Sequence, residues 1–290
     1  MTTSTKPHTK TYHLLDSGNG QKLEQVGKYR LIRPCPQAIW QPSLSKKAWK
    51  TAHAIYQRSK SGGGQWTYKS HLPESWNVNA CFDRTMKIKL TNFGHLGVFP
   101  EQGPNWDWIH QQIQNAKRPI NVLNTFAYTG GSTLAAAMAG ANVVHLDSAR
   151  GIVAWARENA EINQLKTKPI RWIIEDVSKF VAREIRRKRQ YDAIILDPPS
   201  FGRGSKGEVF KFERDFPTLL SQCRQLLSHE PLFVLLSAHT PGFTPLALQN
   251  LLADMTTNLG GHLTCLEMTI PYQNGTRLLP SGVVARWCNF

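Results

Sequence analysis

The sequence predicts an α/β fold, in which a mostly parallel seven-stranded sheet carries helices on both faces and follows a small β-rich N-terminal region. Three observations lead to it. Apolar runs and helix-like segments alternate from Ile120 to the end of the chain, and several of these runs end in an acidic residue or a proline turn. The chain has 290 residues, of which 41% are hydrophobic, enough for one large domain and a smaller partner. Because parallel strands need crossover helices, this alternation indicates βαβ units.

The N-terminal part has a different texture, with short β-like pieces joined by turn residues. We expect a flexible N-terminus over 1–20, a small β-rich region over 21–118 and the α/β domain over 119–290. Within the β-rich region, the sequence predicts an amphipathic helix over 45–60 and strands over 65–70, 76–82 and 85–90.

The α/β domain is expected to follow in regular order, although Pro217 falls within one helical segment. The expected strands are 119–126, 142–147, 170–176, 191–197, 231–238, 262–270 and 282–290. The expected helices are 130–141, 149–165, 177–190, 212–227 and 243–259. An Asn-Gly pair at 274–275 predicts a hairpin between the last two strands.

The charge balance favours a polyanionic partner. The formal net charge is +15 and the pI is about 9.8, which suits phosphate contacts with a nucleic acid such as RNA. A soluble protein that is merely basic remains the alternative. A dense basic run at 183–190 ends a predicted helix, so its cations either contact RNA or stabilise the helix C-terminus.

Cysteine usage and hydropathy narrow the class of protein further. The five cysteines are scattered, without a CxxC pair or zinc-like spacing, which argues against a disulfide framework and against a metal site. No apolar run reaches the roughly 20 residues that span a bilayer, so we expect no membrane association. The first residues lack a secretory core and faintly resemble an organellar transit segment, yet a cytoplasmic location is the expectation.

Three strand ends together predict a nucleoside pocket. Gly130 and Gly131 let the backbone approach a ligand at a helix N-terminus. Asp147 ends the second strand, where it suits a ribose diol, and Asp176 ends the third, where it suits an adenine amino group with Val177 against the ring. Each feature has a structural alternative, because glycine turns are common and both acids could cap the helices that follow.

The fourth strand ends in Asp197-Pro198-Pro199-Ser200-Phe201, which predicts a site for a second substrate. The two prolines end the strand in a stiff turn, and Phe201 could stack on a planar base whose edge meets Asp197 or the Pro198 carbonyl. The basic loop that follows, with Arg203, Lys206 and Lys211, could hold flanking phosphates.

The stretches 123–141, 143–165, 173–180 and 191–204 resemble successive motifs of Rossmann-like class I S-adenosylmethionine-dependent methyltransferases. More narrowly, they resemble the bacterial family that modifies large-subunit ribosomal RNA to 5-methylcytosine or 7-methylguanine. The similarity covers about residues 93–290. It implies S-adenosylmethionine as cofactor and RNA, most simply ribosomal RNA, as partner. Many relatives carry an N-terminal RNA-binding PUA domain, which nothing before residue 90 clearly matches.

Roles can be assigned to individual positions. The resemblance implies cofactor contacts at Phe126, Tyr128, Gly130, Asp147, Asp176 and Asp197, and we expect the neighbouring Thr129, Ser148 and Val177 to contribute as well. Catalytic roles are expected at Asp197, Pro198, Pro199 and Phe201, and substrate or RNA contacts at Ser200, Arg203, Lys206 and His239.

One departure bears on mechanism. The cytosine-5 branch ends its fifth strand in Ser-Cys, whereas this chain has Ser237-Ala238-His239. Cys223 and Cys265 are expected in a helix and mid-strand, as packing residues. The leading interpretation is therefore methyl transfer to a base nitrogen by direct displacement. A protein or small-molecule acceptor and a non-catalytic RNA-binding or assembly factor are alternatives, while a dehydrogenase is disfavoured because the turn lacks GxGxxG spacing.

Overall fold

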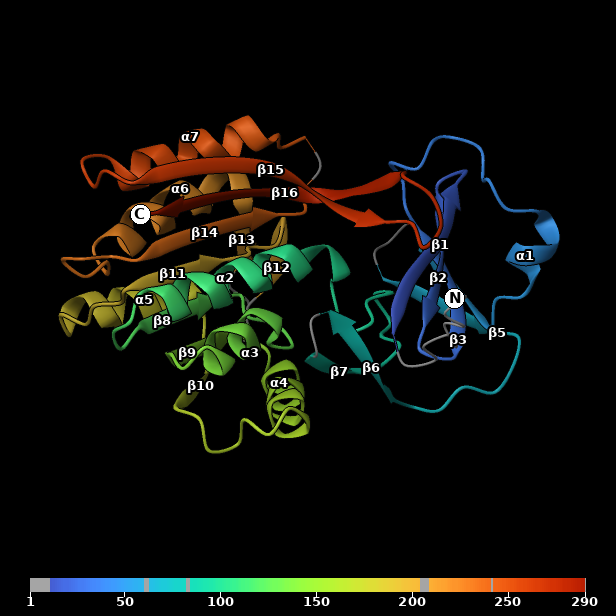
Figure 1. The fold of residues 1–290 in the computed structure, drawn as a ribbon, viewed down its shortest axis with the longest axis horizontal. Coiled ribbons are helices and arrows are strands. Elements are labelled where there is room, and N and C mark those ends of the chain that lie inside the picture. The colour runs from blue at the N-terminus through green and yellow to red at the C-terminus, as the bar shows by residue number, and fades with distance from the viewer. Residues whose placement is uncertain (1–10, 60–62, 82–83, 204–208, 241, 290) are drawn as a thin grey trace, which may run out of the picture. The chain divides into compact units, whose positions relative to one another are not determined.

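The computed structural model describes residues 11–59, 63–81, 84–203, 209–240 and 242–289, with only the backbone at Cys81 and Arg203. The chain divides into two compact units (Figure 1). The first takes the described residues up to Gly103 together with Thr269–Pro280. The second takes Pro104–Met268 and the described residues from Ser281 onward.

The second unit is built on a seven-stranded sheet with the order β10-β9-β8-β11-β14-β16-β15. The first five of these strands pair in parallel, and β16 runs antiparallel to β14. The predicted mostly parallel sheet is therefore confirmed. Its strands are β8 (Asn121–Thr125), β9 (Asn142–Asp147), β10 (Ile170–Ile174), β11 (Ala193–Leu196), β14 (Phe233–Ala238), β15 (His262–Pro271) and β16 (Leu278–Cys288).

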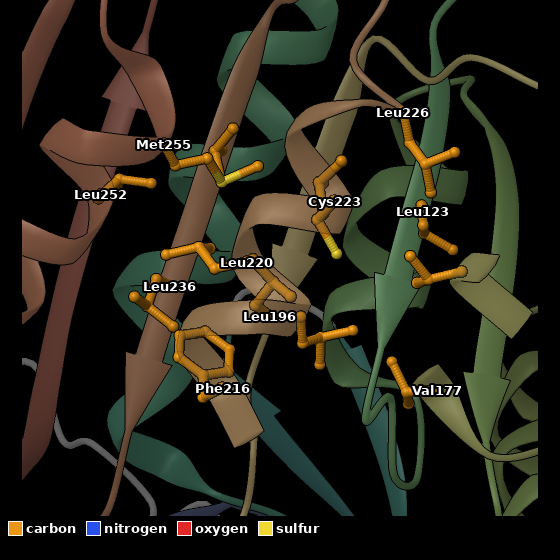
Figure 2. Close-up of a cluster of buried hydrophobic side chains, with 14 of the residues drawn as sticks. Leu123, Val177, Leu196, Phe216, Leu220, Cys223, Leu226, Leu236, Leu252 and Met255 are labelled. Atoms are coloured by element: carbon orange, nitrogen blue, oxygen red, sulfur yellow. The ribbon is translucent and has the colours of Figure 1, made fainter. Parts of the chain in front are cut away.

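One face of this sheet is covered by three helices that share a continuous apolar core. Side chains from successive strands, such as Leu123, Leu196 and Leu236, meet Phe216 and Leu252 of the helices there (Figure 2). Their burial removes apolar surface from water, the main driving force for the fold. The helices are α5 (Val177–Arg186), α6 (Phe212–Arg224) and α7 (Pro245–Thr256). Helix α6 contains Pro217, as the sequence predicted, and the proline is exposed.

The opposite face is covered by α2 (Gly103–Asn115), α3 (Gly131–Met138) and α4 (Arg150–Ile162). Successive side chains of a strand point to opposite faces, so residues next to the apolar core positions turn toward these helices. The Phe233 ring lies 5.1 Å from the Trp108 ring of α2, and Asn124 donates to the Thr133 hydroxyl of α3 at 2.9 Å. Helix α2 was not predicted from the sequence.

The first unit contains a five-stranded sheet with the order β1-β2-β3-β4-β5, and β6 and β7 form a separate antiparallel pair. Neighbours in the five-stranded sheet are antiparallel except β3 and β4. The strands are β1 (Tyr12–Gly18), β2 (Gln21–Val26), β3 (Tyr29–Pro34), β4 (Ala54–Arg58), β5 (Gly64–Tyr68), β6 (Trp76–Cys81) and β7 (Arg84–Ile88).

Three expectations for this part of the chain need correction. The N-terminus expected to be flexible over 1–20 forms β1 from Tyr12, while residues 1–10 lie outside the described residues. The helix expected over 45–60 is only α1 (Lys46–Lys50), because Ala54 and Tyr56 alternate inward on β4, which pairs with β5. The boundary expected after 118 falls before α2, whose Trp106 and Ile109 are buried.

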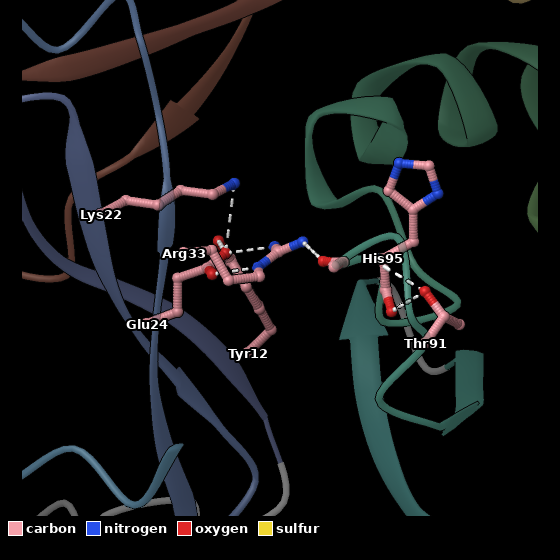
Figure 3. Close-up of polar contacts among 7 residues, drawn as sticks. Tyr12, Lys22, Glu24, Arg33, Thr91 and His95 are labelled. Carbon is pink, nitrogen blue, oxygen red and sulfur yellow. Dashed lines mark hydrogen bonds and ion pairs between the residues drawn. The ribbon is translucent and has the colours of Figure 1, made fainter. Parts of the chain in front are cut away.

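A buried ion cluster stabilises the first sheet (Figure 3). The fully buried Glu24 accepts from Arg33 Nε at 2.6 Å and from the Tyr12 hydroxyl at 2.7 Å, and Lys22 Nζ lies 3.3 Å away. Burial alone would raise the pKa of Glu24, but Arg33 and Lys22 outweigh it and lower the pKa to about 2. Arg33 also donates to the Gly94 carbonyl at 2.9 Å, which ties β3 to the segment after β7.

Candidate active site

The turn between β8 and α3 adopts an unusual backbone conformation. Phe126, Tyr128 and Gly130 have positive φ angles of 52°, 49° and 91°. Such angles cost energy in residues other than glycine, so the surrounding structure must impose them at the two aromatic residues. The Ala127 N–H donates to the Leu146 carbonyl at 3.1 Å, which fixes the turn to the end of β9.

The two glycines of this turn serve different purposes. Gly130 supplies the left-handed conformation before α3. At Gly131, an added Cβ would lie 2.2 Å from Cζ2 of the Trp106 ring, so only glycine allows the first turn of α3 to pack on α2. The first N–H groups of α3 have no partner within the helix, as at any helix start.

Asp147 holds this turn from the end of β9. One carboxylate oxygen accepts from the Tyr128 N–H at 3.0 Å, and the other accepts from the Ala149 N–H at 2.9 Å. Burial raises the pKa of Asp147, and the N–H donors only partly oppose that shift. Within the described ranges Asp147 forms no ion pair. The N-cap position of α4 is Ala149, so Asp147 is not the cap.

Buried polar residues of β9 and α4 support the turn and the start of α3 through further hydrogen bonds. Asn159 of α4 donates to the Thr129 carbonyl at 2.9 Å, and both residues are buried. His145 is fully buried, with Nδ1 2.8 Å from the Thr133 hydroxyl, and burial together with Arg157 lowers its pKa to about 3. Sequence reasoning missed Asn159 and His145, because neither belongs to a recognisable motif.

These residues fit the nucleoside part of S-adenosylmethionine. The Tyr128 and Ala149 N–H groups bind different oxygens of Asp147, so the carboxylate keeps acceptor capacity for ribose hydroxyls. The Gly130 backbone permits close approach of a ligand to the start of α3. Ser148 lies half-buried beside Asp147.

Asp176 and Val177 occupy the start of α5. Asp176 is the N-cap and accepts from the Lys179 N–H at 3.0 Å, as the capping interpretation anticipated. The Val177 side chain is 4% exposed and belongs to the apolar core, so a base could meet this residue through its main chain but hardly through its side chain. Asp176 also borders a cleft of about 410 Å³, together with Phe210 of β13 (Val209–Lys211). The Phe210 ring lies 5.4 Å from that of Phe126.

Asp197 meets two residues from the end of the neighbouring strand β14. The Ser237 hydroxyl donates to Asp197 Oδ1 at 2.8 Å, and His239 Nε2 lies 3.8 Å from the same oxygen. His239 Nδ1 is 3.0 Å from the Ser281 carbonyl, an acceptor, which assigns the Nδ1 hydrogen and makes Nε2 the basic nitrogen. Ser237 was not assigned to the site from the sequence. Its place at the end of the fifth strand would have suggested it, because the fourth and fifth strands are neighbours in the sheet.

The Pro-Pro turn presents an aromatic ring to solvent. Pro198 is buried, whereas Pro199 and Ser200 are exposed and the Phe201 residue is 50% exposed. Ser200 anchors the turn, because its carbonyl accepts from the Phe212 N–H at 3.1 Å and its hydroxyl accepts from Thr240 at 3.0 Å. Phe201 begins β12 (Phe201–Arg203), which pairs with β13 in a hairpin that the sequence did not predict. Arg203 is described only in its backbone, and Lys206 lies outside the described residues.

The cysteines considered as nucleophiles lie away from the strand ends. Cys223 is fully buried in α6, and burial raises its pKa to about 12. Cys265 lies within β15 and donates to Gln249 Oε1 at 2.9 Å. Ala238 ends β14 and is fully buried. The predicted placement of both cysteines is confirmed.

Over the described ranges, no cluster of three or more His, Cys, Asp or Glu has a geometry that could hold a metal ion. None of the helices described has the length and apolarity to cross a membrane.

Known proteins resemble this chain along most of its length. A crystal structure of a SAM-dependent methyltransferase from Agrobacterium tumefaciens is 38% identical, covers 96% of this chain and 90% of its own, and superposes with a TM-score of 0.91. A structure from Streptococcus mutans, 20% identical over 97% of this chain and 76% of its own, shares the fold with a TM-score of 0.72.

Curated relatives are longer proteins. The ribosomal RNA large subunit methyltransferase K/L of Marinobacter nauticus is 28% identical over 184 residues, which are 61% of this chain and 24% of that protein. This chain therefore spans about a quarter of the length of that relative. The family model for S-adenosylmethionine-dependent methyltransferases matches residues 37–252. Since that match includes both the glycine turn and the Pro-Pro turn, the chain belongs to the S-adenosylmethionine-dependent methyltransferase family.

Proposed function

We propose that this chain transfers the methyl group of S-adenosylmethionine to a nitrogen of a base in ribosomal RNA. The observation that carries the proposal is the meeting of Asp197, Ser237 and His239 at two adjacent strand ends, with the half-exposed Phe201 on the turn that follows Asp197. When bound, S-adenosylmethionine supplies an electrophilic methyl group. The protein then has to bind the acceptor and align it, because positioning provides much of the rate in such a displacement.

The proposed cofactor residues are those of the glycine turn and the strand ends beside it. Asp147 would accept the ribose hydroxyls, and the N-terminus of α3 would face the charged amino acid part. Asp176 and the main chain of Val177 would border the adenine. Phe126, Tyr128, Thr129 and Ser148 would contact the cofactor through the backbone that Asp147 and Asn159 hold in place.

The proposed acceptor residues lie on the Pro-Pro turn and the end of β14. Phe201 would stack on the target base, and Asp197 with the Pro198 carbonyl would accept hydrogen bonds from its edge. Ser237 fixes the carboxylate of Asp197 in one orientation. His239 Nε2 could take up a proton that the acceptor nitrogen releases, and Asp197 would stabilise the resulting imidazolium.

RNA is the preferred acceptor for two reasons. The formal net charge of +15 suits a phosphate-rich partner. The name of the Marinobacter nauticus relative states that it methylates ribosomal RNA. Arg203, Lys206 and Ser200 are proposed to contact flanking nucleotides. The cytoplasmic location stays a prediction.

Incubation of the protein with labelled S-adenosylmethionine and RNA from a strain that lacks it tests this proposal. Nucleoside analysis should then show one methylated base with the label on a nitrogen. Label on protein or a small molecule would support the alternative acceptors. Cofactor binding without any transfer to RNA, protein or small molecules would favour a non-catalytic RNA-binding role.

A second experiment tests direct displacement. With no thiol at the end of β14, we expect no covalent enzyme–base intermediate, so replacing the five cysteines with Ala or Ser should leave the chemical step nearly unchanged in folded variants. RNA containing 5-fluorocytosine traps enzymes that attack the pyrimidine ring. A stable adduct at Cys223 or Cys265 would overturn the proposed nitrogen acceptor.

A further inference from the structure

A large cavity lies at the amino ends of the parallel strands, whereas the candidate active site lies at their carboxyl ends. Its volume is about 620 Å³. The starts of β8, β9 and β10 line it, together with the loop before β10 and the segment after α5. We call it the amino-end cavity. The lining residues that matter here are Lys168, Arg171, Glu184, Arg187, Arg189 and Tyr191.

The amino-end cavity carries an excess of positive charge. Of the described residues that line it, Glu184 is the one acid. Glu184 is 1% exposed and already engaged, since it accepts from the Tyr191 hydroxyl at 2.7 Å and pairs with Arg187 at 3.6 Å. The side chains of Lys168, Arg171 and Arg189 form no ion pair with any residue that the structure describes. Three exposed cations thus face one concavity without an acid to balance them.

Two ordinary explanations account for single residues but not for the set. Cations near a helix C-terminus stabilise its dipole, which would explain Arg187. Cations on an edge strand prevent aggregation, which would explain Arg171 on β10. Neither explains why cations from an edge strand, the loop before it and the end of α5 line the same cavity.

The turn after α5 places alternate residues of the basic run in the wall of the amino-end cavity. Lys188 adopts a φ of 52°, its N–H donates to the Ile185 carbonyl at 2.9 Å, and the Arg189 N–H donates to the Glu184 carbonyl at 3.0 Å. These two bonds form a Schellman motif, which closes the helix and reverses the chain. Arg187 and Arg189 line the cavity as a result, whereas Arg186 and Lys188 do not.

We propose that the amino-end cavity binds backbone phosphates of the RNA substrate, an inference that rests on the proposed RNA acceptor. Guanidinium groups bind phosphate oxygens bidentately. Among the described residues that line the cavity, Tyr191 is the only aromatic one; it is 5% exposed and its hydroxyl is bound to Glu184, so none of them offers a ring for stacking on a base. Phosphates without base contacts fix the position of an RNA but read no sequence. A five-residue strand is about 17 Å long, a distance that a folded RNA can cover between the two ends of the sheet.

The test compares two double variants of the full chain that remove the same charge. Arg171→Gln with Arg189→Gln changes the cavity, while Arg186→Gln with Lys188→Gln changes the same basic run outside it. Binding of a labelled RNA hairpin is measured over a salt series. The cavity variant should bind at least about tenfold more weakly at low salt, and the slope of its log affinity against log salt should fall by about 0.7–0.9 for each lost contact. The control should stay close to the parent.

Calorimetry with S-adenosylhomocysteine and competition by inorganic phosphate separate the possible failures. Both variants should bind S-adenosylhomocysteine like the parent. Equal weakening of RNA binding in both variants, or none in either, would overturn the cavity assignment and leave the proposed function intact. A parent that fails to bind RNA would overturn the RNA acceptor as well. If inorganic phosphate binds to the parent and not to the cavity variant, yet does not compete with RNA, the cavity would be a site for a free anion instead.

Discussion

Each unit of the molecule holds a carboxylate at a structural position, fully buried at Glu24 and half-buried at Asp147, and the two are stabilised in opposite ways. In the first unit, Glu24 is neutralised by Arg33 and Lys22, which lower its pKa to about 2 against the effect of burial. In the second, Asp147 is held by backbone N–H groups, and burial raises its pKa. A carboxylate with its own cation has its charge balanced within the protein. One without a cation remains open to a ligand, which is why perturbed acids mark candidate sites.

The comparison extends to Asp197, and its replacement by Ala should give the largest effect. Asp197 is held by the Ser237 hydroxyl, so its carboxylate can contact the acceptor base. We expect Asp197→Ala to slow methyl transfer by about 10²–10⁴-fold, the range typical of a lost acid–base or positioning group. Single-turnover kinetics measures this, with Glu161→Ala on the exposed surface of α4 as the control. A folded Asp197→Ala variant with parental turnover would contradict the assignment.

Breaking the ion cluster should have the largest effect on stability. Arg33→Met leaves the fully buried Glu24 without its main partner, which should lower the free energy of unfolding by about 3–5 kcal/mol. Urea unfolding measures the loss, and a simultaneous Glu24→Gln replacement should restore part of it. The exposed pair Lys166–Glu161 provides the control, since Lys166→Met should leave the midpoint unchanged. If Arg33→Met also left the midpoint unchanged, the first unit would not depend on this charge pairing.

At Asp147 the effect should fall on binding instead of on stability. Asp147→Ala should weaken the binding of S-adenosylhomocysteine by about 1–3 kcal/mol, the usual value of lost charge-assisted hydrogen bonds. Asp147→Asn keeps one acceptor oxygen and should lie between the parent and Ala. Titration calorimetry gives the affinities, and an unchanged affinity in a folded Ala variant would remove Asp147 from the cofactor site.

Low pH should destabilise the second unit before the first, and this effect on stability should be smaller than those above. The folded protein keeps His145 neutral, with a pKa near 3 against an ordinary 6.5, because burial and Arg157 disfavour its charge. Below pH 6.5 the unfolded chain therefore binds a proton that the folded unit does not, and stability falls by about 1.4 kcal/mol per pH unit at most. Glu24 loses its contribution only below its ordinary 4.5.

Hydrogen exchange on peptides from each unit can follow this acid response. The second unit should weaken first as the pH falls, and His145→Gln should abolish that early loss. The comparison of parent and variant reports on His145 alone, because the raised pKa of Asp147 contributes equally to the pH dependence of stability in both proteins. Simultaneous weakening of both units in the parent would show that the buried imidazole does not set the acid limit.

The sequence predicted the α/β part well because its signals are local. Apolar runs that end in acids, glycines at 130 and 131, and alternating helices do not depend on distant partners. The first unit was predicted less well. Ala54–Arg58 becomes a strand because it pairs with β5, and Tyr12–Gly18 because it pairs with β2. Both pairs are hairpins of neighbouring strands, but each strand is short and mixes apolar with polar residues, so its own sequence gives only a weak strand signal.

The candidate site divides along the same line. Asp147 and Asp197 carry motif signals, whereas Ser237 and Asn159 matter only through residues about 40 and 30 positions away in the chain. Whether Asp147 and Asp176 cap the helices that follow them depends on hydrogen-bond geometry, which the spacing of residues in the sequence does not reveal. Asp176 does cap its helix, while Asp147 does not cap α4 but bonds to Tyr128.

The segment Thr269–Pro280, which belongs to the first unit, affects how the protein can be made. The outer edge of β1 bonds to this segment: the Gln273 N–H donates to the Leu14 carbonyl at 2.8 Å, and the Ser17 and Tyr272 hydroxyls are bonded across a separation of 255 residues. A ribosome synthesises Ser17 of β1 255 residues before Tyr272. The edge of β1 therefore stays without this partner while Pro104–Met268 of the second unit are made, and a nascent chain stalled in α7 would still expose it to chaperones or to other chains.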